Sequence, residues 1–222
     1  MSNVFQRVAG VILVSAAAAC ATATAAIGPI PAPAVDLPLS TAKGQQTVVV
    51  AGGCFWGIQA VFQHVRGVRQ ATSGYSGGSA DTAEYETVST GTTGHAESVQ
   101  VIFDPSEVTF GQILHVFFAV AHNPTELNFQ GPDHGTQYRS VIFYGDADQK
   151  RVAQAYVTQL DDAHVFAAPI VTEIVPLTAF YAAEDYHQNY ATLHPNDPYI
   201  VFNDAPKVAN LKKALPALYT GK

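Results

Sequence analysis

Cys54 is the residue whose type and position best fit a chemical role. It lies in the segment AGGCFWG at positions 51–57, and the only tryptophan of the chain, Trp56, follows two positions later. A β-branched apolar run at 47–51 comes first and a helical apolar pattern follows, so Cys54 should stand where a strand passes into a helix. The unpaired N–H groups of a helix N-terminus stabilise a thiolate, which predicts a nucleophile with a lowered pKa.

The same segment admits other interpretations. A free cysteine is often a small buried hydrophobe, with Phe55 and Trp56 then serving as core aromatics. The string Cys-Phe-Trp also faintly resembles the Cys-Trp of papain-like hydrolases, but the flanking pattern of those enzymes is absent. The glycines lack the spacing and the lysine of a phosphate-binding loop. Residue types alone leave a nucleophile and a buried core residue as the main alternatives.

The elements that must position Cys54 follow from the periodicity of the chain. Strands are predicted at 47–51, 68–72, 99–103, 140–144 and 171–175, helices near 58–65, 110–117 and 146–160, and loops at 74–80 and 122–135. Thr109 and Asp146 are the expected N-caps. Because the spacing from Val68 to Phe103 is that of a hairpin, we expect an α+β fold: a mixed β-sheet with packed helices, a two-layer α/β sandwich with a ferredoxin-like core.

The first 25 residues have the pattern of a secretory signal peptide. Arg7 precedes an apolar run at 8–19, and Ala23-Thr24-Ala25 fits the small-x-small cleavage site. The run is too short to span a bilayer, so no integral membrane span is expected in the mature form. We expect an exported, periplasmic protein. A second interpretation is a lipoprotein signal, with the protein anchored through Cys20 at the end of the run.

Composition and domain organisation limit the remaining options. Residues 26–45 are rich in proline and alanine and predict an extended linker, which leaves a single domain over 46–222. The formal net charge of −7 and the lack of a basic patch with aromatics argue against nucleic acid as a partner. Removal of residues 1–25 would leave Cys54 as the only cysteine, and a single exported thiol is either buried and inert or reactive by purpose.

Further motifs decide between these alternatives, because in order they resemble the A-type peptide methionine sulfoxide reductases. The segment AGGCFWG is similar to the signature of that family. The blocks GYSGG, YE, GHAE, DHGTQYRS and AEDYHQ follow at 74–78, 85–86, 94–97, 133–140 and 183–188. The resemblance spans about Val48 to Pro195. It implies an oxidoreductase that reduces methionine S-sulfoxide, free or in proteins, and that spares the R epimer.

The resemblance also implies a role for each matching residue. Taken alone, Glu97 would be a solvated carboxylate, Tyr85 and Tyr138 would be scaffold tyrosines, and Asp133 would cap a loop. Matched to the family, they become the nucleophile Cys54, the acid Glu97 near the sulfoxide oxygen, the phenols Tyr85 and Tyr138 that hydrogen-bond to that oxygen, the aromatics Phe55 and Trp56 that hold the methyl group, and Asp133, which shapes the substrate site.

The chemistry of the reaction agrees with these roles. Reduction of a sulfoxide needs a soft nucleophile on sulfur, which Cys54 supplies, and a proton for the departing oxygen. Glu97 can supply the proton if burial raises its pKa, and neutral tyrosine hydroxyls can stabilise charge on the oxygen. The expected products are a methionine side chain and a sulfenic acid on Cys54.

The chain departs from many relatives in its cysteines. Position 89 is serine and residues 208–222 contain no cysteine, so an intramolecular disulfide step is in doubt. We expect no bound cofactor and an external reductant: a thioredoxin-like protein, a glutaredoxin or a small thiol. No metal is expected, because the histidines at 95, 122, 134 and 187 lack the His-x-x-x-His spacing of a helical zinc site.

Two other classes of function stay open at this point. A cysteine hydrolase or acyltransferase would need a histidine within hydrogen-bonding reach of Cys54. A non-catalytic module could instead bind methyl-bearing side chains through Phe55 and Trp56.

Overall fold

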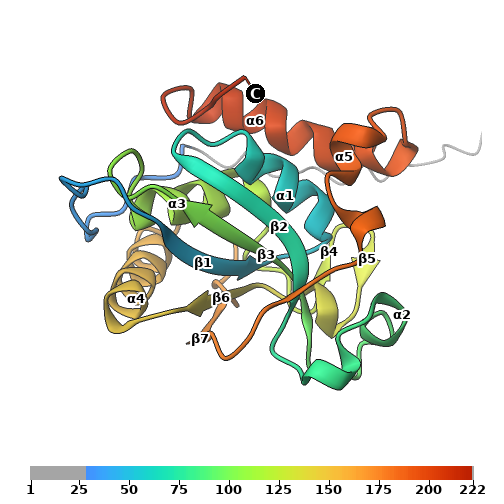
Figure 1. The fold of residues 1–222 in the computed structure, drawn as a ribbon. Helices are drawn as coiled ribbons and strands as arrows, with labels where there is room; N and C mark the ends of the chain where they lie inside the picture. The colour runs from blue at the N-terminus through green and yellow to red at the C-terminus, as the bar shows by residue number, and fades with distance from the viewer. Residues whose placement is uncertain (1–28, 222) are drawn as a thin grey trace, which may run out of the picture.

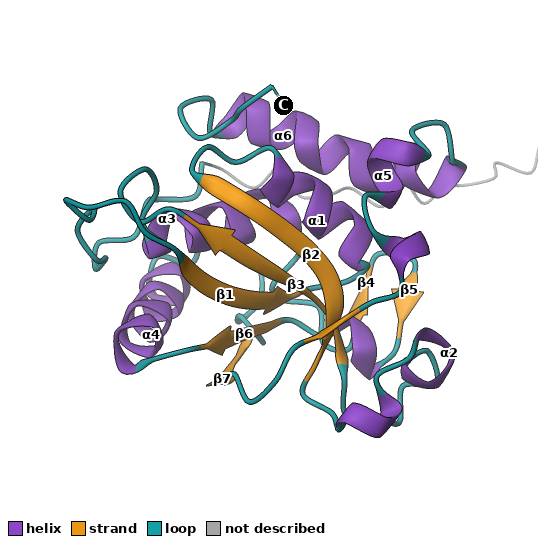
Figure 2. Ribbon diagram, viewed as in Figure 1, coloured by secondary structure: helices purple, strands orange, loops and turns teal. Residues whose placement is uncertain are grey.

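A six-stranded mixed sheet carries the fold of residues 29–221, the part of the chain that the computed structural model describes (Figures 1 and 2). The strands are β1 (Gln46–Ala51), β2 (Val68–Ser76), β3 (Ala96–Phe103), β6 (Val141–Tyr144), β7 (Glu173–Pro176) and β8 (Tyr181–Ala182), with a small hairpin of β4 (Phe129–Gln130) and β5 (Asp133–His134) outside the sheet. The helices are α1 (Phe55–Gln63), α2 (Tyr85–Val88), α3 (Phe110–Val116), α4 (Ala147–Asp162), α5 (Tyr190–Leu193) and α6 (Ala205–Ala214). A π-helix, η5 (Ile200–Asp204), leads into α6.

The strand order, β7-β6-β1-β3-β2-β8, reflects a βαββαβ core. Strands β6, β1, β3 and β2 pair antiparallel, and β7 joins the edge parallel to β6. The register between β1 and β3 places Ala51 opposite Ser98. The α+β class with a mixed sheet is therefore confirmed.

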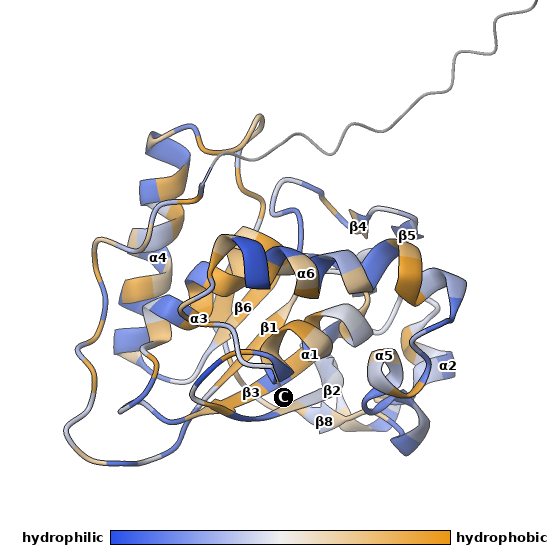
Figure 3. Cartoon of the chain, turned by 90° about the horizontal axis from the view of Figure 1, so that it is seen from above, coloured by the Kyte–Doolittle hydropathy of each residue, from blue (hydrophilic) through white to orange (hydrophobic). Residues whose placement is uncertain are grey.

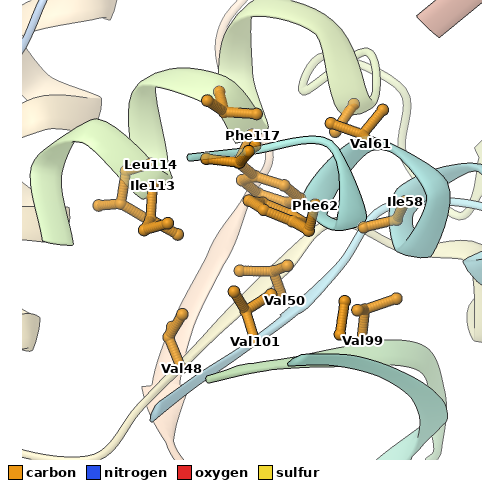
Figure 4. Packing of buried hydrophobic residues seen from close by; sticks show 14 of the residues in the cluster. Val48, Val50, Ile58, Val61, Phe62, Val99, Val101, Ile113, Leu114 and Phe117 are labelled. Carbon is orange, nitrogen blue, oxygen red and sulfur yellow. The ribbon is translucent and has the colours of Figure 1, made fainter. Parts of the chain in front are cut away.

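The two faces of the sheet are covered differently. Helices α1, α3, α4 and α6 place apolar side chains in one core against the first face, part of which Figure 4 shows. The strand residues of this core include Val48, Val50, Val99 and Val101, all fully buried. On the second face, Val141 and Phe143 pack with residues of the segment 175–180. Figure 3 shows apolar residues on β1, β6 and α1, and α6 lying over them with mixed apolar and polar positions.

Most predicted elements appear, with shifted boundaries. Thr109 and Asp146 are the N-caps of α3 and α4, as predicted, and Thr109 forms a full capping box with Gln112. Strand β2 continues through Ser76, into residues expected to form a loop, because it pairs with β3 along its whole length. The early start of β3 puts Glu97 inside a strand rather than ahead of one.

The proline- and alanine-rich segment is not a free linker where the structure describes it, from residue 29 onward. It has no helix or strand, as expected, but it is bonded to the helical layer. Asp36 accepts a hydrogen bond from the N–H of Gly111 at the start of α3 (2.8 Å), and the hydroxyl of Tyr156 on α4 donates to the carbonyl of Pro31 (2.8 Å). The predicted signal peptide and Cys20 lie outside the described residues. Between residues 29 and 221, no helix is long and apolar enough to cross a membrane.

Candidate active site

Cys54 is the N-cap of α1 and is separated from the end of β1 by two glycines, as its position in the sequence predicts. The turn that presents it requires glycine. Gly53 has a φ of +96° and lies against the side chain of Gln130, and any side chain on Gly52 would overlap the ring of His122. The glycines therefore let two loops close around the turn that carries the sulfur.

The thiol of Cys54 is buried, with 8% of the residue exposed. Burial raises its pKa well above the usual value, and the nearby carboxyl groups of Glu97 and Asp204 raise it further when they are ionised. The backbone N–H of Trp56 and the charge of Lys207 act in the opposite direction but do not outweigh burial. The predicted lowering of the Cys54 pKa is therefore wrong for the free protein, which holds this residue as a neutral thiol.

Glu97, the carboxyl group expected to supply a proton, is buried beside the turn that carries Cys54. It is 3% exposed, and its Oε2 accepts a hydrogen bond from the backbone N–H of Phe55 (3.2 Å), the first residue of α1. Burial raises the pKa of Glu97 to about 8, against the lowering effect of that hydrogen bond, and the charges of Asp133 and Asp204 add to the rise. Glu97 consequently holds a proton at neutral pH while it contacts the helix turn that begins at Cys54.

Phe55 and Trp56 form an aromatic wall on the first turn of α1. The Phe55 ring lies 5.0 Å from that of His187, centroid to centroid. The half-buried Trp56 ring stacks on Tyr190 at 3.8 Å, and its Nε1 donates a hydrogen bond to Nδ1 of His187 (3.2 Å). Tyr199 meets the Trp56 ring edge-on at 5.9 Å. Several contacts hold the wall, so its shape is defined before any substrate arrives.

The three remaining predicted residues come from separate elements and meet around the same place. Tyr85 opens α2, Tyr138 ends a short 3₁₀ turn, and Asp133 lies in β5. Burial raises the pKa of both phenols, and the charges of Glu97 and Cys54 contribute to each rise. Burial also raises the pKa of Asp133, whose carboxylate accepts a hydrogen bond from the Tyr199 hydroxyl. The phenols thus stay protonated, as neutral hydroxyls beside the acid and the thiol.

Other residues join the site that the sequence interpretation did not assign to it. Glu184 accepts the hydroxyl hydrogen bond of Tyr75 (2.8 Å) and the N–H of Tyr85 (2.9 Å), and so ties α2 to the sheet. His187 and Glu184 lie within the block AEDYHQ, which could have drawn attention to them. A second group comes from chain segments outside every recognised motif: Tyr190, Tyr199, Asp204 and Lys207.

The arrangement of histidines disfavours a hydrolase. In the described part of the chain no hydrogen bond joins Cys54 to a histidine. His122 lies behind Gly52, with its ring nitrogens bonded to the carbonyl of Phe117 (3.1 Å) and the hydroxyl of Ser140 (2.7 Å). Burial lowers the pKa of His122 to about 3, so it stays neutral. Across residues 29–221, no group of three histidine, cysteine or carboxylate side chains is placed to hold a metal ion.

The buried acid makes stability depend on pH in a defined direction. In the unfolded chain Glu97 should ionise near its ordinary pKa of 4.5, whereas in the folded protein it holds its proton up to about pH 8. Its contribution to stability is therefore complete below pH 4.5 and is lost as the pH rises to about 8. Glu97→Gln does not titrate, so the free energy of unfolding of the wild type minus that of this variant should fall between pH 5 and pH 9. Urea unfolding at both pH values measures it, and a difference that does not change with pH would contradict the burial of a protonated Glu97.

Comparison with known proteins agrees with this site. The sequence profile of one family, described as peptide methionine sulfoxide reductase, matches residues 46–217. A peptide methionine sulfoxide reductase MsrA 2 of Mesorhizobium japonicum is 62% identical over 181 residues, which cover 82% of this chain and 93% of that protein. The structure of methionine sulfoxide reductase A of Corynebacterium diphtheriae superposes with a TM-score of 0.62 at 33% identity, covering 77% of this chain and 87% of the other. The structure of reduced Mxr1 from Saccharomyces cerevisiae superposes with a TM-score of 0.62 at 32% identity, covering 71% of this chain and 90% of the other. This chain therefore belongs to the peptide methionine sulfoxide reductase family, and its activity is the reduction of methionine sulfoxide.

Proposed function

We propose that this protein reduces the S epimer of methionine sulfoxide in a cycle that uses Cys54 as its single catalytic cysteine and an external thiol as reductant. One observation carries the proposal: a buried, protonated Glu97 lies next to a buried thiol at the start of a helix, beside a wall of aromatic rings. A proton donor, a soft nucleophile and an apolar surface are the three things that this reaction needs.

The substrate fits the site in one orientation. Its methyl group lies against Phe55 and Trp56, and its oxygen faces Glu97 and the hydroxyls of Tyr85 and Tyr138. The methyl group and the oxygen are directed to different sides of the sulfoxide sulfur. With both in place, only one of the two epimers leaves the rest of the methionine pointing out of the site. Asp133 supports this arrangement by holding the hydroxyl of Tyr199, which meets the Trp56 ring.

The reaction moves two electrons from the cysteine sulfur to the methionine sulfur. Glu97 gives its proton to the sulfoxide oxygen as the Cys54 sulfur bonds to the substrate sulfur, and the thiol proton passes to the Glu97 carboxylate. The bond between the substrate sulfur and its oxygen then breaks. The oxygen, now a hydroxyl group, bonds to the Cys54 sulfur as the bond between the two sulfurs breaks. Cys54 is left as a sulfenic acid, methionine leaves, and Glu97 is again protonated, so atoms and charges balance.

Recycling needs a thiol from outside the described chain. Cys54 is the only free cysteine within residues 29–221, so a second thiol must come from a thioredoxin-like protein, a glutaredoxin or a small thiol. That thiol attacks the sulfenic acid, water leaves, and a mixed disulfide with Cys54 forms. A further thiol then releases Cys54 and becomes oxidised in its place.

The role of Glu97 as acid predicts the effect of its amide. Glu97→Gln should lower kcat for methionine-S-sulfoxide by about 10²- to 10⁴-fold, the range expected for general acid catalysis. The amide keeps the shape and accepts the N–H of Phe55, but it has no acidic proton to give. Steady-state kinetics with dithiothreitol measure the effect, and a variant within a few-fold of the wild type would remove Glu97 from this role.

The one-cysteine cycle predicts the result of a single turnover. Without reductant, each enzyme should release one methionine from the S epimer and then stop, with a sulfenic acid on Cys54 that dimedone traps. The R epimer is the matched control and should release none. Mass spectrometry of the Cys54 peptide checks the adduct. Recovery of a disulfide between two chains as the necessary intermediate would contradict the cycle, because a neighbouring Cys54 would then be the resolving thiol.

The N-terminal pattern supports a location outside the cytoplasm. We propose that the chain is exported to the periplasm and cleaved near Ala25, or is lipidated on Cys20 and anchored there. The mass of the mature protein from a cell extract distinguishes the two, since a lipid adds a defined mass to a chain that begins at Cys20. An intact Met1 in the cytoplasm would refute both forms of export.

A further inference from the structure

The C-terminal segment brings a buried ion pair to the helix that carries the nucleophile. Asp204 is the last residue of η5, and Lys207 lies in the first turn of α6, which packs across α1 (Figures 1 and 3). The Lys207 Nζ is 3.1 Å from Oδ1 of Asp204. The aspartate side chain is fully buried and that of the lysine is 22% exposed. Both partners of the pair belong to the C-terminal segment, which packs on α1.

The absence of a side chain at Gly57 leaves the space that the Asp204–Lys207 pair occupies. A methyl group on Gly57 would overlap the Asp204 carboxylate and would lie 2.9 Å from Nζ of Lys207. Gly57 is three residues after Cys54, and side chains three apart lie on the same side of a helix. The carboxylate and the ammonium group therefore lie beside the turn from which the sulfur projects, in the space that a side chain at position 57 would fill.

Stability alone does not account for this pair. The Oδ2 atom of Asp204 is buried with no hydrogen-bond partner. A buried ionic group with an unpaired oxygen costs free energy, and buried ion pairs are often no more stable than apolar side chains of similar size. The compensation available is electrostatic: the Lys207 ammonium and the positive end of α1 both attract the carboxylate.

Lys207 differs in charge from the other groups that face the thiol. Asp204 on η5 and, when it is ionised, Glu97 on β3 bring negative charge, whereas Lys207 brings positive charge. The other titratable groups within electrostatic range of Cys54 are phenols from four separate segments: Tyr85, Tyr138, Tyr190 and Tyr199. Asp133 acts on Glu97 and Tyr199 rather than directly on the thiol. Among these groups Lys207 is the one cation.

We propose that Asp204 and Lys207 are positioning residues that set the charge state of Cys54, with Lys207 favouring the thiolate and Asp204 holding the lysine against the first turn of α1 while opposing the thiolate itself. The pair lies beside Gly57, within electrostatic range of Cys54. It can therefore act on the sulfur throughout the cycle, including while substrate or reductant occupies the open side.

The pair matters most in the last step of recycling, a part of the inference that rests on the proposed function. In that step the second thiolate of a dithiol reductant attacks the reductant sulfur of the mixed disulfide. A disulfide forms within the reductant, the bond to Cys54 breaks, and Cys54 leaves as a thiolate. A leaving thiol with a lower pKa leaves faster, so the charge of Lys207 speeds the release.

The test is the pH dependence of Cys54 alkylation by iodoacetamide in the full chain, without sulfoxide or reductant. Lys207→Gln should move the profile to higher pH and Asp204→Asn should move it to lower pH, each by about 0.5 to 1.5 units, the scale of one nearby charge at a partly screened site. Lys207→Arg should restore the wild-type profile. Lys212→Gln on the same helix is the matched control and should change nothing.

The opposite directions of the two expected pH shifts distinguish this electrostatic role from a structural one. Loss of packing would move the Gln and Asn variants in the same direction, and that result, or no shift in Lys207→Gln, would overturn the proposal. If Asp204→Asn does not fold, the Lys207 series alone decides, since the arginine variant must rescue what the glutamine variant loses. With a dithiol reductant, Lys207→Gln should also lower kcat, by about threefold for each unit by which the thiol pKa rises. A chain that shows the alkylation shifts but does not reduce methionine sulfoxide would refute the proposed function and leave the charge-setting pair in place.

Discussion

The site depends on the burial of a thiol and a carboxyl group side by side at the start of one helix. The β1–β3 register makes this possible, because it pairs the end of β1 with Ser98 and so brings Glu97 next to the turn that follows β1. The N–H of Phe55 then bonds to the carboxyl group. A shift of one residue in this register would turn Glu97 to the other face of the sheet, so the reactive pair is set by strand pairing rather than by a flexible loop.

Burial has one electrostatic consequence throughout the site. It is the largest cause of the raised pKa of Cys54, Glu97, Asp133 and Asp204 alike. A low-dielectric site favours the neutral form of every acid in it, and here that yields a protonated acid and a protonated thiol together. The site therefore begins the reaction with a proton on Glu97 and a proton on the Cys54 sulfur.

Local parts of this arrangement could be predicted from the sequence, and the parts made by tertiary packing could not. The strand, the glycine turn and the helix around Cys54 are contiguous, so their order and spacing indicate the nucleophile directly. A helix N-terminus by itself predicts a lowered pKa for Cys54, but desolvation is the larger effect here and raises that pKa. Asp204 and Lys207 follow the last recognised motif, and only the packing of α6 on α1 brings them to the site. The segment at 29–45 has no periodicity that could indicate its hydrogen bonds to α3 and α4.

The neutral resting thiol also fits a chain with no second cysteine in its described part. Thiolates react with oxidants far more readily than thiols do, and a sulfenic acid without a thiol partner can oxidise further and irreversibly. A raised pKa limits that side reaction while the site is empty. The cost is a weaker nucleophile. In the cycle proposed above, the site offsets this cost when a sulfoxide binds, because the carboxylate that remains once Glu97 has given its proton to the oxygen is a base next to the thiol. In that cycle the substrate itself activates Cys54, and the burial that protects the sulfur also couples its deprotonation to the reduction.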